Sequence, residues 1–155
     1  MATTTDYAHE SSFIFRMGNS VKEVEFNITG VSGMGVSLGQ IDLNWQSTKM
    51  KRPGDEVTFG ELSLTVLLDE DFNSFTESIE FIKLFKDYEA NTTSWDDAFT
   101  GILMTTNNRN RFNKTFEFHN CWFQSVSDLT FTSTSTDATP LTFTISVIYD
   151  YFSYK

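Results

Sequence analysis

The sequence predicts an α+β protein of mainly antiparallel β structure, a β-sandwich or partial barrel with one amphipathic helix packed on it. Four segments alternate apolar and polar residues, which is the pattern of strands with one buried face. One segment repeats its apolar residues every three or four positions, as a helix does. Phenylalanine occurs 16 times and proline only twice in 155 residues, a composition that favours aromatic-rich strands. A chain of this length buries one core, so we expect a single domain over residues 13–155 after a flexible arm at 1–12.

The first two principal strands are expected at residues 21–30 and 57–68. In the first, Val24, Phe26 and Ile28 share one face, with polar residues between them. The second strand has the same alternation, with leucine and valine at every other position and glutamate, serine and threonine between them. We therefore expect one buried and one polar face for each strand.

The segment between these two strands has a different composition. A glycine-spaced stretch at 30–39 predicts a loop or a kinked strand. It is followed by a basic segment with Lys49, Lys51 and Arg52, and then by Pro53-Gly54-Asp55, a sequence typical of turns.

One long helix is expected at residues 72–88. The acidic residues at 69–71 precede it, and carboxylates there can accept hydrogen bonds from the unpaired N–H groups of the first turn. We interpret the apolar stripe of this helix as core rather than as an interface. The stripe consists of Phe72, Phe75, Ile79, Ile82 and Phe85.

The remaining strands are expected at 102–106, which is short, and at 114–123 and 141–152, which are principal strands. Four apolar residues fall on the faces that are otherwise polar, so those strand ends must bulge, leave the sheet or become covered. These four are Leu67, Cys121, Phe123 and Ile148.

Charge and motifs exclude several classes of function. A net charge of −10 argues against binding nucleic acid through its phosphates, which requires clustered lysine and arginine. The single cysteine, Cys121, excludes an intramolecular disulfide framework. His119 and Cys121 are expected on one strand face, but zinc needs at least three protein ligands and no others lie nearby in sequence. The sequence shows no secretory signal, no apolar stretch of 18 residues and no catalytic motif, so we expect neither a membrane segment nor an enzyme, cofactor or metal site.

Two long stretches resemble the tail tube proteins of contractile-tailed bacteriophages. The first stretch is MKRPGDEVTFGELSLTVLLDEDFNSFTESIEFIKLF, which is similar to the family's Pro- and Gly-rich turn, to its strand ending in an Asp-Glu-Asp-Phe sequence and to the helix that follows. The second stretch, LTFTISVIYDYFSY, resembles the family's last long strand. The earlier F-x-I-T-G-V-S-G stretch is similar to the family's first strand and loop. The likeness covers roughly residues 20–152.

The resemblance implies hexameric rings that close one continuous β-barrel and stack into a hollow tube, through which DNA passes. It also implies sheath and baseplate or terminator proteins as partners. The tube would be assembled in the host cytoplasm and would be part of the virion tail. It assigns residues 40–60 to an extended loop that reaches the adjoining ring. Candidate inter-ring contacts are Lys49, Met50, Lys51, Arg52, Pro53, Gly54, Arg109 and Arg111. The polar strand faces would give the tube an acidic lining, with candidate residues Glu23, Glu25, Asn27, Ser63, Thr65, Glu117, His119, Thr142, Thr144 and Ser146.

Three alternatives remain open at this point. A baseplate or tail-terminator component would share the fold but stop at one ring. The inner tube of a contractile injection system would have the same fold and the same mode of assembly. A monomeric β-sandwich that binds carbohydrate would use the tryptophans Trp45, Trp95 or Trp122.

Overall fold

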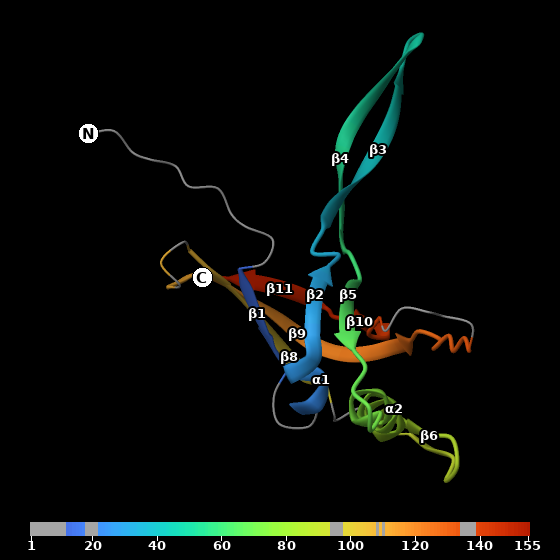
Figure 1. Cartoon of the computed structure of the whole chain (residues 1–155). Coiled ribbons are helices and arrows are strands. Elements are labelled where there is room, and N and C mark those ends of the chain that lie inside the picture. The colour runs from blue at the N-terminus through green and yellow to red at the C-terminus, as the bar shows by residue number, and fades with distance from the viewer. Residues whose placement is uncertain (1–11, 18–21, 94–97, 108, 110, 134–138) are drawn as a thin grey trace.

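The computed structural model describes residues 12–17, 22–93, 98–107, 109, 111–133 and 139–155 (Figure 1). A seven-stranded antiparallel sheet forms the body, in the order β1-β8-β9-β10-β5-β2 with β11 pairing on β9. A long β3–β4 hairpin projects from the body, and β6 and β7 form a small separate pair. The elements are β1 Phe13–Arg16, α1 Lys22–Asn27, β2 Ile28–Ser32, β3 Val36–Trp45, β4 Thr48–Phe59, β5 Leu62–Leu67, α2 Asn73–Phe85, β6 Lys86–Asp87, β7 Thr92–Thr93, β8 Phe99–Thr106, β9 Phe112–Val126, β10 Thr142–Ile148 and β11 Tyr151–Tyr154.

Strand β9 belongs to two parts of the sheet and bends between them. Its first part pairs with β8 and β11, and its last part pairs with β10. At the bend, Asn120 has a left-handed φ of 55°, and its side-chain amide donates to the Asp150 carboxylate at 2.7 Å. The extra residue reverses the alternation, so Phe118 and Cys121 are both fully buried. The expectation that the strand must bulge near Cys121 and Phe123 is confirmed.

The core lies between the apolar faces of the two parts of the sheet and helix α2. The inward residues of β5, β10 and β9 alternate with half-buried or exposed ones along each strand. Phe118 contacts the rings of Tyr149, Phe152 and Phe15 at centroid distances of 4.9, 5.6 and 6.3 Å. Helix α2 covers the other part, where Phe81 lies 4.6 Å from the ring of Phe123.

The predicted helix is present, but its buried face is rotated from the predicted stripe. Its buried residues are Ser74, Ser78 and Phe81, whereas Phe72 is exposed and left-handed at the N-cap. The two serines let the helix approach the sheet closely, and Ser78 donates to the carbonyl of Ser74 at 2.8 Å. The residues Phe75, Ile82 and Phe85 of the predicted stripe pack at the edge of the core.

The expected capping by the acidic run is confirmed for one residue. The Asp69 carboxylate accepts hydrogen bonds from the backbone N–H groups of Asn73 and Ser74, both at 3.2 Å. Partial desolvation opposes the charged form of Asp69, but these hydrogen bonds outweigh it and lower the pKa of its carboxyl group.

The strand expected at 21–30 is wrong in its first part, because Lys22–Asn27 forms helix α1 and the strand begins at Ile28. Val24 is fully buried and its N–H donates to Glu77 of α2 at 3.0 Å, so docking on α2 favours the helix. Phe26, expected on the buried face, is 87% exposed.

The turn expected at Pro53-Gly54-Asp55 is also wrong. The chain reverses at Gln46, which has a left-handed φ of 55°, and the Pro-Gly sequence lies inside β4. There the register shifts, since Gln40 pairs with Pro53 and Leu38 with Val57. The turn residues therefore form a bulge in a long hairpin instead of closing a short one.

Tyr149 allows a test of the core. Its hydroxyl is buried and has no hydrogen-bond partner within the described part of the chain, and burial, together with nearby Cys121, raises its pKa. An unpaired buried hydroxyl costs roughly 1–3 kcal/mol, so we expect Tyr149→Phe to stabilise the fold by about 1 kcal/mol. Thermal denaturation followed by circular dichroism would measure this. A lower melting temperature would show that the hydroxyl is bonded.

Candidate functional site

One face of the sheet carries a row of hydroxyl groups. Ser32 of β2 lies opposite Ser63 of β5, Ser63 opposite Ser146 of β10, and Ser146 opposite Ser125 of β9. Residues that are paired across neighbouring strands point to the same side of a sheet. Four strands therefore contribute one serine each to a continuous row, which we call the hydroxyl face.

A second row of the hydroxyl face runs beside the serines. Thr65 of β5 lies opposite Thr144 of β10. The backbone N–H of Thr144 donates to the hydroxyl of Ser127, and the N–H of Ser127 donates to the carbonyl of Thr144, both at 2.8 Å. None of the four strand segments that form this face, 28–32, 62–67, 122–126 and 142–148, contains a charged residue. The face is thus neutral and polar.

The structure brings half of the predicted lining residues together. Ser63, Thr65, Thr142, Thr144 and Ser146 share the hydroxyl face. The face also contains Ser32 and Ser125, which sequence reasoning missed. Ser32 falls in the glycine-rich segment that was expected to be a loop or a kinked strand, and Ser125 lies beyond the predicted end of its strand. The bulges of β2 and β9 place these two serines on the same face as Ser63 and Ser146, and an alternating sequence does not show where a bulge occurs.

The other five predicted lining residues lie elsewhere. Glu23, Glu25 and Asn27 are on helix α1, so the strand alternation that linked them to the hydroxyl face does not hold. Glu117 and His119 lie in β9 before the bend at Asn120 and pair with β11. The centre of the hydroxyl face therefore carries hydroxyl groups where an acidic lining was expected.

His119 makes contacts with β11. Its Nε2 lies 3.1 Å from the hydroxyl of Ser153, and its ring stacks on Tyr151 with centroids 4.5 Å apart. The prediction that His119 and Cys121 share a face is wrong, because the bend between them reverses the alternation and buries the thiol. Burial raises the pKa of Cys121 to about 11, which leaves it a protonated core residue at neutral pH. The described residues contain no cluster of three potential metal ligands, and none of their helices is long and apolar enough to span a membrane.

The hydroxyl face is bounded by two open strand edges. Among the described strands, β2 pairs only with β5, and none pairs with the outer side of β9 between Trp122 and Val126. Since successive strands are antiparallel, β2 and β9 run in opposite directions. The β2 edge of one copy can therefore continue the sheet antiparallel to the β9 edge of another, and a head-to-tail contact of this kind gives a ring when its rotation closes and a filament when it does not.

The β3–β4 hairpin is amphipathic and exposed along its length. Its cross-strand pairs place Leu43 opposite Met50 on one side and Asp42 opposite Lys51 on the other. The exposed apolar residues of the first side are Ile41, Leu43, Trp45 and Met50, whereas Val36, Leu38 and Val57, nearer the sheet, belong to the other side by their register. Exposed apolar side chains on a projecting hairpin are typical of an interaction surface.

The predicted inter-ring residues fall in two places. Lys49, Met50, Lys51 and Arg52 follow the hairpin tip, Pro53 is the last paired residue before the bulge, and Gly54 is the first residue of the bulge. Arg109 and Arg111 lie in the β8–β9 connection instead, where their backbone N–H groups both donate to Asn107 at 3.0 Å. The tryptophans are also dispersed, with Trp45 at the hairpin tip, Trp122 on β9 and Trp95 outside the described residues.

Solved structures match this fold, whereas no family model and no curated protein matches the sequence. A chain of the anti-feeding prophage cap, a tube-terminating cap, aligns with a TM-score of 0.75 over 100% of this chain and 95% of its own length, at 15% identity. A chain of the sheath/tube terminator of the extracellular contractile injection system PVC aligns at 0.73 over 99% of both chains, at 16% identity. A chain of the PVC sheath–tube complex aligns at 0.69 over 96% of this chain and 91% of that one, at 16% identity.

These alignments confirm the predicted fold class and extend over nearly the whole of each chain. The expected resemblance to proteins of contractile tails is confirmed at the level of the fold. The chain therefore has the fold of proteins found in the cap, the terminator and the sheath–tube complex of contractile injection systems.

Proposed function

We propose that this chain is a tube subunit of a contractile tail or injection system, in which copies join edge to edge into rings and the rings stack into a hollow tube. The observation that carries the proposal is the uncharged hydroxyl face between two open, oppositely directed strand edges. An open edge on a monomer invites uncontrolled pairing, whereas ring closure pairs every edge once. The full-length fold match supports the same arrangement.

We infer that six copies form each ring. The fold also matches a chain of the anti-feeding prophage baseplate, whose structure is 6-fold symmetrised, with a TM-score of 0.70 over 99% of this chain, at 13% identity. Six copies of a four-stranded face would give about 24 strands and a barrel roughly 50 Å across at the backbone. Side chains would leave a bore on the order of 40 Å.

The hydroxyl face would line that bore. Because its strands carry no lysine or arginine, the wall would not hold the phosphates of passing DNA, and its hydroxyl groups would keep it wetted. A neutral wall would pass a protein cargo equally well. Sheath and baseplate proteins would then bind the outside and the ends of the tube.

Electron microscopy of the purified chain tests ring formation. Thr29 lies at the register shift of β2, where no residue of β5 is paired with it, although its hydroxyl donates to the carbonyl of Thr65 at 3.3 Å. Thr29→Pro removes the backbone N–H of this edge-strand residue and that one side-chain hydrogen bond, so it should disturb the sheet little. We expect the unaltered chain to form rings and tubes, and Thr29→Pro to remain a folded monomer.

Thr130→Pro is the matched control, because Thr130 is exposed and lies beyond the end of β9. It should assemble like the unaltered chain. Circular dichroism must show that both variants are folded. A chain that stays monomeric at high concentration, or Thr29→Pro rings as abundant as those of the control, would refute closure through the β2 edge.

A terminating cap is the second candidate, favoured by the matches to the prophage cap and the PVC terminator. A cap would close a ring through the same edges but would not stack on itself. The lengths of the assemblies in the same micrographs decide between the two, since a tube subunit forms long tubes and a cap forms single rings.

A further inference from the structure

Two exposed apolar surfaces flank strand β2, one before it and one after it. Phe26 precedes the strand, at the end of α1, and is 87% exposed. After the strand, the part of the β3–β4 hairpin nearest the sheet exposes Val36, Leu38 and Val57, which we call the base cluster. In a ring that closes through the β2 edge, the position of the neighbouring copy decides which of the two surfaces it covers.

The base cluster points to the same side of the sheet as the core. Val36 lies opposite Phe59 and Leu38 opposite Val57, and side chains paired across two strands share one side. The ring of Phe59 contacts that of Phe152, beside the core, at a centroid distance of 5.5 Å. The base cluster therefore lies on the core side and not on the side of the hydroxyl face.

The opposite edge of the sheet carries an apolar depression of about 590 Å³, which we call the β9 pocket. Its apolar lining consists of Ile82 and Phe85 of α2, Ala98, and Trp122 and Phe123 of β9. Helix α2 covers the core side of the sheet and packs on Phe123, so the pocket and the base cluster lie on the same side. A depression of this size can hold more than one side chain.

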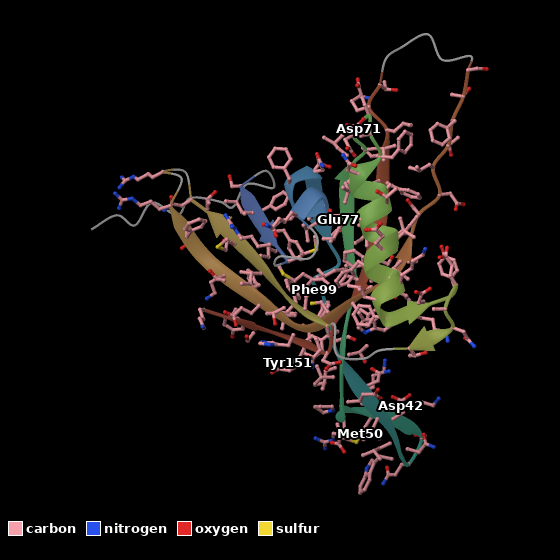
Figure 2. All side chains as sticks on the ribbon, turned by 90° about the horizontal axis from the view of Figure 1, so that it is seen from below. Asp42, Met50, Asp71, Glu77, Phe99 and Tyr151 are labelled. Carbon is pink, nitrogen blue, oxygen red and sulfur yellow. The ribbon has the colours of Figure 1, made fainter. Side chains whose placement is uncertain are left out.

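Figure 2 shows at which edge each of these surfaces lies. It looks at the sheet from the side of α2, with Asp71 at the start of α2 uppermost and the hairpin with Asp42 and Met50 at the lower end. Helix α1 (blue), which leads into β2, lies to the left of β5 (green) in this view. The strand order β9-β10-β5-β2 then places β9 and its pocket on the right.

The tilt of barrel strands determines where the neighbouring copy lies. If the hydroxyl face lines the bore, Figure 2 is a view from outside the ring. Strands of a barrel tilt by about 35–45° from its axis, and their right-handed twist makes them rise from lower left to upper right in such a view. A copy on the left, at the β2 edge, is therefore displaced downward along the strands. This displacement brings its β9 pocket toward the base cluster and away from Phe26, which lies at the upper end of β2.

The charged groups beside the two surfaces are complementary. Lys86 lines the β9 pocket, and its Nζ donates to two side chains of the β6–β7 pair at 3.0 and 3.3 Å. An ammonium group has three N–H donors, so one remains for a carboxylate. Asp150 of the pocket already accepts a hydrogen bond from Asn120 at 2.7 Å. The base cluster adjoins Asp55 and Glu56, both exposed, which can supply the carboxylate.

We propose that the β9 pocket receives the base cluster of the next copy in the same ring. Val36 and Leu38 enter the pocket, and Glu56 pairs with Lys86. This inference rests on the proposed ring and adds a side-chain contact to the backbone pairing of its strand edges. The backbone pairing closes the ring, and the apolar contact lowers the concentration at which it closes.

A pair of cysteines tests the contact. In Leu38→Cys combined with Ala98→Cys, mild oxidation should link neighbouring copies into a ladder on a denaturing, non-reducing gel that ends at the size of one ring. Leu38→Cys combined with Phe112→Cys should give no ladder, since Phe112 is exposed on β9 outside the pocket. The native Cys121 is buried and does not interfere.

A matched pair of charged variants provides the second measurement. Leu38→Asp brings a charge into the apolar pocket and should raise the concentration needed for rings about tenfold. Phe26→Asp makes the same kind of change at the other end of β2 and should stay within about twofold of the unaltered chain. Both side chains are exposed in the single copy, so circular dichroism should show that both variants are folded.

The outcomes separate this contact from the ring itself. If the unaltered chain forms rings, then a missing ladder, a ladder longer than one ring, or equal effects of the two aspartates would each show that the pocket assignment is wrong while the ring proposal stands. If the unaltered chain forms no rings, the ring proposal fails and the pocket assignment fails with it.

Discussion

Phe118→Ala is expected to destabilise the fold by about 3–5 kcal/mol, the usual range for a fully buried phenylalanine. The ring of Phe118 is fully buried, and the rings of Phe15, Tyr149 and Phe152 surround it. It lies just before the bend of β9, so its loss leaves a cavity where the two parts of the sheet meet. Total stability of a small domain is about 5–15 kcal/mol, and the variant should therefore be partly unfolded at 37 °C.

Phe112→Ala is the matched control, because it makes the same change on the same strand at a side chain that is 63% exposed. Guanidinium denaturation followed by tryptophan fluorescence would measure both, at concentrations low enough to prevent assembly. We expect the Phe112 variant to stay within about 0.5 kcal/mol of the unaltered chain. Equal losses for the two variants would mean that the core does not centre on Phe118.

The strands that sequence reasoning located best are those with a long, regular alternation. Leu62, Leu64 and Val66 are all fully buried, as their spacing predicts. Strand β10 follows the same rule. In both strands one local pattern extends over six or more residues and agrees with the tertiary contacts, so local preference and packing favour the same structure. Helix α2 was located correctly, but its buried residues are Ser74, Ser78 and Phe81 and not those of the predicted stripe.

The helix α1 could not be predicted, because its six residues fit two patterns. Val24, Phe26 and Ile28 suit a strand, and the helix is selected only by contacts far along the chain, such as that of Val24 with Glu77. Tertiary contacts of this kind override local propensity. For the same reason Glu23 and Glu25 are part of helix α1 and not of the predicted strand.

The site was predicted only in part because three bulges set its geometry. The bend at Asn120 separates His119 from Cys121, and the register shifts in β2 and near Ser125 align the serine row. A bulge displaces one residue and reverses every face that follows. Asparagine tolerates a left-handed φ better than most residues, so the asparagine at position 120 is the only feature of the sequence that indicates a bend there.

Gly33→Ala is expected to cost at least about 2 kcal/mol, because two effects act together. Gly33 has a φ of 92°, which an L-residue rarely adopts, and a Cβ there would lie 1.8 Å from the carbonyl oxygen of Glu61. This glycine joins β2 to the hairpin, where the N–H of Gly60 donates to the carbonyl of Gly35 at 2.9 Å. A methyl group on residue 33 would fit only if the hairpin moved relative to the sheet.

Gly35→Ala separates this effect from the general effect of adding a methyl group, since nothing lies within 4 Å of a Cβ at Gly35. We expect it to be neutral or to stabilise by up to about 1 kcal/mol. Thermal denaturation measures the stability of both variants, and electron microscopy measures their assembly. In the proposed assembly the edges that close a ring lie on β2 and β9, whereas Gly33 sets the direction of the hairpin. A folded Gly33 variant should therefore form rings that stack poorly, and long tubes from it would show that stacking does not depend on the direction of the hairpin.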